Sequence, residues 1–84
     1  MRVEFSKKFQ KTLKKLPKNI QEKFDERFAL FTGNKFHLLL NNHSVHPIYI
    51  RARSINVTGD YRASCFEEGD MILFTDIGTH SELY

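Results

Sequence analysis

The hydrophobic residues of this chain follow two different spacings, and the change between them limits the folds that are open to it. Up to residue 33, phenylalanine and leucine recur every three or four positions, the spacing of one helix face. Beyond residue 47, apolar and polar residues alternate, which is the pattern of half-buried strands. Helices followed by strands predict an α+β protein.

The first half predicts a short strand and two helices. Residues 2–5 alternate as a strand does, and Ser6 offers an N-cap for the helix that follows. The apolar stripe of this helix consists of Phe9, Leu13 and Leu16. Pro17 either ends this helix or opens the next one at its first turn. The second stripe consists of Ile20, Phe24, Phe28 and Phe31. Gly33 and Asn34 form a helix stop, so we expect two antiparallel helices with their phenylalanines in the core.

The second half predicts three strands. Residues 49–57 alternate in polarity, and residues 61–66 and 71–77 look like two more strands. Residues 58–60 mark a break between the first two strands, and residues 67–70 form a hairpin turn between the last two. The expected order is therefore βααβββ in a single domain, residues 1–84.

Composition places the chain in a cellular setting. The 84 residues contain one cysteine, Cys65, so neither an internal disulfide nor a cysteine zinc site can form, and the cytosol is the natural compartment. Cys65 lies in an expected strand, where we predict buried packing and not a nucleophile. No apolar run approaches the roughly 20 residues of a membrane span, and residues 1–10 lack the apolar core of a signal peptide. We expect a cytoplasmic protein without membrane contact.

Positive charge is concentrated in the first half. Residues 1–42 carry ten Lys or Arg against four Asp or Glu, whereas residues 43–84 carry three against six. A basic helix suggests a polyanionic partner, because lysine gains affinity by releasing counterions from phosphates. A solvated lysine-rich face is an equally good interpretation of charge alone.

Histidine and arginine are the candidates for chemistry. His43 and His46 have a spacing that suits a metal, but a third ligand is missing, so we expect no metal and no cofactor. Arg62 lies in a strand, where it either pairs with a carboxylate such as Glu67 or Asp70 or serves a site. Cleavage of RNA without a metal needs a base, an acid and a fixed cation, and these two residue types supply all three.

Three segments together resemble a known family. They are FSKKFQKTLKKLP in the first helix, RSINVTGDYRASC around the central hairpin, and MILFTDIGTHSELY at the C-terminus. The chain resembles the RelE/ParE superfamily of toxins from type II toxin–antitoxin systems, most closely the RelE-like and YafQ-like mRNA interferases. This resemblance implies a helical hairpin packed on a small, mainly antiparallel sheet. It also implies an endoribonuclease that cleaves messenger RNA in the ribosomal A site.

The resemblance assigns roles to particular residues. His80 matches a catalytic histidine that acts as general acid or base. His43 matches the histidine ahead of the sheet, which takes the other of these two roles. Arg62 matches the sheet arginine that stabilises the phosphate. The remaining catalytic matches are Tyr84 and Asp60. RNA or ribosome binding falls to Lys7, Lys8, Lys11, Lys14, Lys15, Lys18, Arg51, Arg53 and Tyr61. Implied partners are the ribosome with its messenger and a cognate antitoxin, with operator DNA reached only through the antitoxin complex.

Two alternatives stay open at this point. Asn56 stands where YafQ-like members carry a further histidine, so one proton-transfer group is replaced by an amide. This replacement keeps open a catalytically inactive binding module with the toxin fold. The second alternative is a ParE-like inhibitor of DNA gyrase, because one fold can host both activities.

Overall fold

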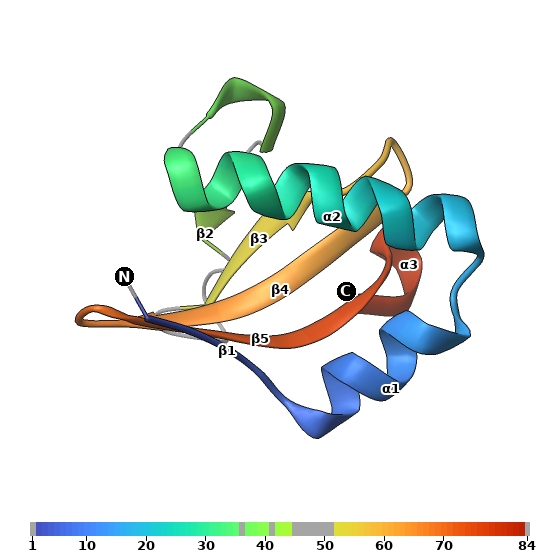
Figure 1. The fold of residues 1–84 in the computed structure, drawn as a ribbon, viewed down its shortest axis with the longest axis horizontal. Coiled ribbons are helices and arrows are strands. Elements are labelled where there is room, and N and C mark those ends of the chain that lie inside the picture. Colours follow the sequence, from blue (N-terminus) through green and yellow to red (C-terminus); the bar gives the residue numbers. More distant parts are fainter. Residues whose placement is uncertain (1, 36, 41, 45–51, 84) are drawn as a thin grey trace.

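The computed structural model describes residues 2–35, 37–40, 42–44 and 52–83, with His43, Ser44 and His80 described by their backbone alone. The elements, in order, are β1 Arg2–Phe5, α1 Lys7–Lys15, α2 Lys18–Gly33, a 3-10 helix η1 Leu38–Leu40, β2 His43–Ser44, β3 Ala52–Asn56, β4 Tyr61–Glu68, β5 Met71–Thr79 and α3 His80–Leu83 (Figure 1). The α+β class is confirmed, and η1, β2 and α3 are short elements that the periodicity did not predict.

The sheet has five strands in the order β1-β5-β4-β3-β2. β1 runs parallel to β5, and the other three pairs are antiparallel. Further backbone hydrogen bonds flank this parallel pair: the Arg2 N–H donates to the carbonyl of Asp70, just before β5 (2.8 Å), and the Ser6 N–H donates to the carbonyl of Phe74 (2.9 Å). The mainly antiparallel sheet expected from the resemblance is therefore confirmed.

Local signals place the helix ends. The Ser6 hydroxyl accepts a hydrogen bond from the Phe9 N–H at 3.0 Å, so Ser6 is the predicted N-cap of α1. Pro17 fulfils both alternatives, because α1 ends just before it and α2 begins just after it. At the other end of α2, the Asn34 N–H donates to the Leu30 carbonyl.

Phenylalanine rings fill the space between the helices and the sheet. Phe74 of β5 is fully buried, and its ring centroid lies between 5.5 and 5.9 Å from five others. Those five rings belong to Phe5, Phe9, Phe24, Phe28 and Phe31. In Figure 1, α2 crosses one face of the sheet while α1 lies beside the end of β5. The predicted core stripes of both helices are thus confirmed.

Within the described ranges, no helix has both the length and the apolar character required to cross a membrane.

Candidate active site

Strand register assigns each residue of the sheet to one of two faces. Ala63 is fully buried in the phenylalanine core, and its neighbour Arg62 therefore projects from the opposite face. We call this opposite side the distal face. Arg62 pairs with Asn56 of β3 and with Gly78 of β5, so these three positions form one row across the distal face.

Two side chains of β3 hold the guanidinium of Arg62. Its Nε donates to the Ser54 hydroxyl at 2.8 Å, and its Nη1 donates to the Asn56 side-chain oxygen. Ser54 is completely buried and Arg62 is half-buried, so this arrangement is shielded from water. Both acceptors are uncharged side chains, and they orient the guanidinium. Glu67, a carboxylate considered for Arg62, pairs with Lys35 at 2.8 Å.

The turn that carries His80 is built onto the same face. Thr79 and Glu82 form a capping box, in which the Thr79 N–H donates to Glu82 Oε1 (2.8 Å) and the Glu82 N–H donates to Thr79 Oγ1 (3.3 Å). A Cβ added to Gly78 would lie 3.2 Å from Glu82 Oε1 and 3.6 Å from Leu83 Cδ2. The absence of a side chain at Gly78 therefore lets α3 fold against β5. Since Gly78 pairs with Arg62, the backbone of His80 begins beside the arginine row.

His43 is the second predicted histidine, and its backbone lies at the edge of the sheet in β2. It pairs in register with Ser54, the residue whose hydroxyl accepts from Arg62. The structure thus brings the backbone of His43 to the row next to the guanidinium. His37, by contrast, follows α2, where its Nδ1 accepts the Leu39 N–H at 3.2 Å.

Asp60 and Tyr61 are adjacent in sequence but differ in environment. Asp60 is exposed in the turn between β3 and β4, where the Thr58 hydroxyl accepts both backbone N–H groups, at 3.3 Å from Asp60 and 3.0 Å from Tyr61. Tyr61 begins β4 and packs against the core, on the face opposite to Arg62. The structure therefore does not place Tyr61 beside the arginine, whereas Asp60 lies at the end of the sheet where α3 starts.

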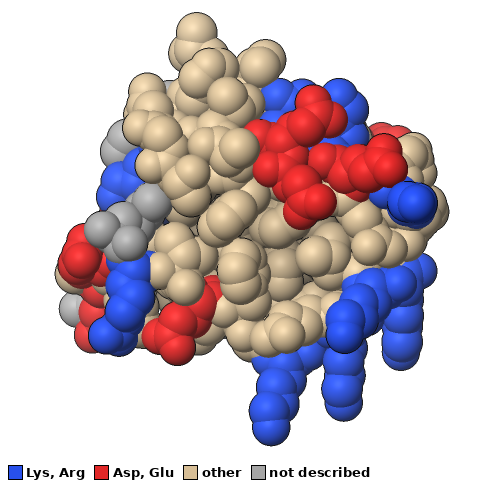
Figure 2. Space-filling view, in the orientation of Figure 1, with Lys and Arg blue, Asp and Glu red and all other residues tan. Residues whose placement is uncertain are grey.

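The basic residues fall into two environments. All six α1-region lysines are exposed, and Figure 2 shows lysine and arginine side chains projecting from the side of the molecule where α1 lies. They are Lys7, Lys8, Lys11, Lys14, Lys15 and Lys18. Arg53 is half-buried, pairs in register with the core residue Cys65, and donates to the Asn42 side-chain oxygen at 2.6 Å. Arg51 and Tyr84 lie outside the described residues.

Cys65 is buried on the core face. Burial, followed by the negative charge of Glu67, raises its pKa to about 12. A thiol that stays protonated near neutral pH is a poor nucleophile, which agrees with the packing role predicted for it. In the described part of the chain, no three His, Cys, Asp or Glu side chains are grouped closely enough to hold a metal ion.

Comparison with solved structures identifies the fold. No protein-family model and no curated protein sequence matches this chain. YafQ from E. coli strain BL21(DE3) is 21% identical with a TM-score of 0.82, over 100% of this chain and 99% of that chain. The toxin–antitoxin complex RelB-RelE from Methanococcus jannaschii contains a match at 25% identity and a TM-score of 0.71, over 95% and 93% of the two chains. This chain has the fold of the RelE/ParE toxins.

A solved structure of lower sequence identity has the same fold. A YoeB/ParE toxin from Agrobacterium tumefaciens is only 12% identical, yet it has a TM-score of 0.79 over 95% of this chain and 99% of that chain. The RelE/ParE fold predicted from the three sequence segments is therefore confirmed. Its short C-terminal helix brings the His80 backbone to the arginine row in this chain.

Sequence reasoning missed two supports of the site. Ser54, which holds Arg62, was not singled out, because a serine in a strand has no signal of its own. The capping box could have been found, since Thr79 followed three residues later by Glu82 is a known helix-start pattern.

Proposed function

We propose that this chain is the toxin of a toxin–antitoxin pair and that it cleaves messenger RNA in the ribosomal A site. The observation that carries the proposal is Arg62, a half-buried guanidinium oriented by Ser54 and Asn56 beside the turn that begins with His80. A cation fixed in this way suits the charge that grows on phosphorus during RNA cleavage. The likeness to YafQ, YoeB/ParE and RelE toxins supports the same assignment.

The proposed reaction needs only side chains of the protein. A base removes the 2′-hydroxyl proton, and the resulting oxygen attacks the adjacent phosphorus. The 5′-oxygen leaves with a proton from the acid, which yields a 2′,3′-cyclic phosphate and a 5′-hydroxyl end. His80 and His43 are assigned to the two proton transfers, and Arg62 stabilises the pentavalent phosphate. Asn56, an amide, cannot transfer the proton, and it holds Arg62 in place.

The remaining residues have supporting roles in this proposal. Asp60 orients a histidine or the arginine, and Tyr84 stacks on an unpaired base. The α1 lysines bind ribosomal RNA through its phosphates. An antitoxin partner is proposed because DinJ-YafQ and RelB-RelE were each solved as a complex.

The test compares two histidines of one chain. His80→Ala is expected to abolish growth arrest on expression, and primer extension on messenger after brief induction is expected to show no cuts. His37→Ala is the matched control, because His37 lies beyond α2 in a local contact with Leu39. It is expected to arrest growth and cut within translated codons as the parent does.

Two results would overturn the proposal. One is a His80→Ala protein that cuts messenger as fast as the parent. The other is a parent that leaves messenger intact and inhibits supercoiling by purified gyrase, which would favour the gyrase inhibitor.

A further inference from the structure

A β-bulge in the sheet places an acidic residue on the distal face. Up to the bulge, Ile72 and Phe74 of β5 face the core, and simple alternation would put Asp76 there as well. The register shifts between Ser64 and Cys65 of β4, so that Asp76 pairs with Ser64 while Ile77 is buried in the core. Bulges commonly redirect side chains near functional sites. Here the bulge turns Asp76 toward the side that carries Arg62.

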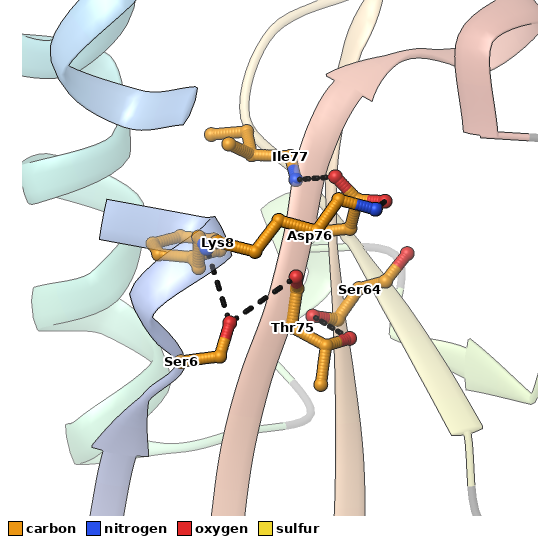
Figure 3. A network of polar contacts seen from close by, with 7 residues as sticks. Ser6, Lys8, Ser64, Thr75, Asp76 and Ile77 are labelled. Atoms are coloured by element: carbon orange, nitrogen blue, oxygen red, sulfur yellow. Dashed lines mark hydrogen bonds and ion pairs between the residues drawn. The ribbon is translucent and has the colours of Figure 1, made fainter. Parts of the chain in front are cut away.

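Asp76 receives a lysine from α1. Lys8 Nζ lies 3.1 Å from Asp76 Oδ2, and Figure 3 shows the Lys8 side chain crossing β5 to reach it. The start of α1 is also tied to the bulge, because the Ser6 hydroxyl donates to the Thr75 carbonyl at 3.4 Å. The ammonium of Lys8, at the start of α1, thus reaches the distal face.

Both carboxylate oxygens of Asp76 have partners within the protein. Its Oδ1 accepts the Ile77 N–H at 3.0 Å, and its Oδ2 faces Lys8. A carboxylate engaged through both oxygens is badly placed to remove a substrate proton. Lys8 differs, because an ammonium has three donors and the pair with Asp76 uses one. The Lys8 side chain is 72% exposed, so its other donors can reach a ligand.

The position of this pair relative to Arg62 is set by the sheet. Arg62 and Ser64 are two residues apart on β4, and Asp76 lies opposite Ser64, so Arg62 and Asp76 are diagonal neighbours. Such neighbours are about 7–8 Å apart. Lys8 Nζ, held 3.1 Å from Asp76 Oδ2, is therefore placed on the same face as Arg62, beside its row.

We propose that Lys8, positioned by Asp76, binds a phosphate next to the one that Arg62 contacts at the cleavage point. The inference rests on the proposed nuclease function and adds a subsite to it. It also separates Lys8 from the other α1 lysines, which serve the general attraction to ribosomal RNA. The chemistry recognised is the phosphodiester backbone of single-stranded RNA, independent of the base.

The experiment uses short messengers bound in the A site of ribosomes, each with one uncharged methylphosphonate linkage. The linkage lies one position 5′ or 3′ of the cut. Single-turnover cleavage gives kcat/KM for the parent and for Lys8→Gln, Asp76→Asn and the double variant. Lys23→Gln is the matched control, because Lys23 forms a comparable exposed pair with Glu26 on α2 (3.5 Å). Urea unfolding of each protein checks that the fold is intact.

The expected result is a dependence on one phosphate. On the all-phosphate messenger, Lys8→Gln lowers kcat/KM about tenfold, as expected for a lost hydrogen bond to a charged group. On the messenger whose neutral linkage occupies the Lys8 subsite, the same substitution has no further effect. Asp76→Asn lowers kcat/KM by a smaller factor, and the double variant is no worse than Lys8→Gln. Lys23→Gln matches the parent on every messenger.

Three outcomes would overturn the inference. If Lys8→Gln lowers kcat/KM by the same factor on every messenger, Lys8 does not contact a flanking phosphate. If Asp76→Asn raises kcat/KM, its carboxylate repels the substrate and does not position the lysine. Both outcomes leave the nuclease function intact. A parent protein that cuts none of the messengers contradicts the nuclease proposal itself, and the subsite falls with it.

Discussion

The two faces of the sheet are built from alternate residues of the same strands, yet they differ in composition and in the kind of contact they make. On the core face, Phe74 has no exposed surface and lies among five other phenylalanine rings. On the distal face, hydrogen bonds connect Arg62 with Asn56 of its own row and with Ser54 of the next row, and an ion pair joins Lys8 to Asp76. Apolar packing is non-directional and supplies most of the folding free energy, whereas hydrogen bonds fix orientation.

This division predicts that the two faces respond differently to substitution. A change on the core face should lower the free energy of unfolding and affect activity only through the amount of folded protein. A change on the distal face should alter activity or local geometry while the unfolding free energy stays close to that of the parent. The predictions below test this separation.

The largest effect on stability is expected from Phe74→Ala. Removing a fully buried ring leaves a cavity, so the free energy of unfolding should fall by about 3–5 kcal/mol. Phe66→Ala on β4 is the matched control, because Phe66 faces the distal side and is 38% exposed. Its free energy of unfolding should fall by much less. Urea unfolding followed by circular dichroism measures both. Equal losses would contradict the division between the faces.

The thiol of Cys65 offers a second test of the core face. Because burial raises its pKa to about 12, the thiolate fraction near pH 8 falls roughly a thousandfold below that of an ordinary cysteine. Labelling of the native protein by a thiol reagent should be slower by at least this factor, and unfolding in urea should restore the ordinary rate. A native labelling rate close to the unfolded one would show that Cys65 is accessible and the core face is open.

Periodicity was enough to predict most of the core face. The helical stripes ending in Phe31 and the alternation through Ile55 are local patterns, and each local pattern agreed with the final packing. The segments quoted for the resemblance led to the correct fold. The three strands of the second half were also found, although the short pairing of β2 with β3 was not.

The distal face was less predictable, because it depends on register. Alternation along MILFTDI predicts that Asp76 lies on the same side as Phe74, and only the bulge reverses this. A bulge is set by long-range pairing between β4 and β5, which a single sequence does not reveal. The same holds for the partners of Arg62, since Ser54 and Asn56 become its neighbours only when β3 pairs with β4.

Gly78→Ala is expected to have an intermediate effect that separates activity from stability. The new methyl group would lie 3.2 Å from Glu82 Oε1, so the end of the flexible Glu82 side chain, which accepts the Thr79 N–H of the capping box, must shift. Because α3 begins with His80, the histidine proposed for proton transfer, the proposed function leads us to expect cleavage of messenger to slow about tenfold, a size typical of a displaced catalytic group. The free energy of unfolding should change by less than about 1 kcal/mol. A loss of stability with unchanged cleavage of messenger per folded molecule would contradict this division.

The smallest effect is expected at Glu82, and it depends on pH. Hydrogen bonds from Thr79, first from its backbone N–H and then from its side chain, hold the pKa of Glu82 below its usual range. The contribution of the carboxylate is therefore present above the ordinary glutamate pKa and is lost as the pH falls through the lowered value. The amide chemical shift of Thr79, followed by NMR from pH 7 to acid, should titrate with this lowered pKa.

Two variants of Glu82 distinguish a structural cap from a simple charge effect. Glu82→Gln keeps an acceptor for the Thr79 N–H, so α3 should stay in place and the titration should disappear. Glu82→Ala removes the acceptor, so α3 should loosen at every pH. Neither change should alter the ring signals of Phe74, because Glu82 packs against Gly78, which pairs with Arg62 on the distal face, and the rings lie on the other face. A Phe74 signal that follows the Thr79 titration would mean that the two faces are coupled through β5, against the separation inferred from the register.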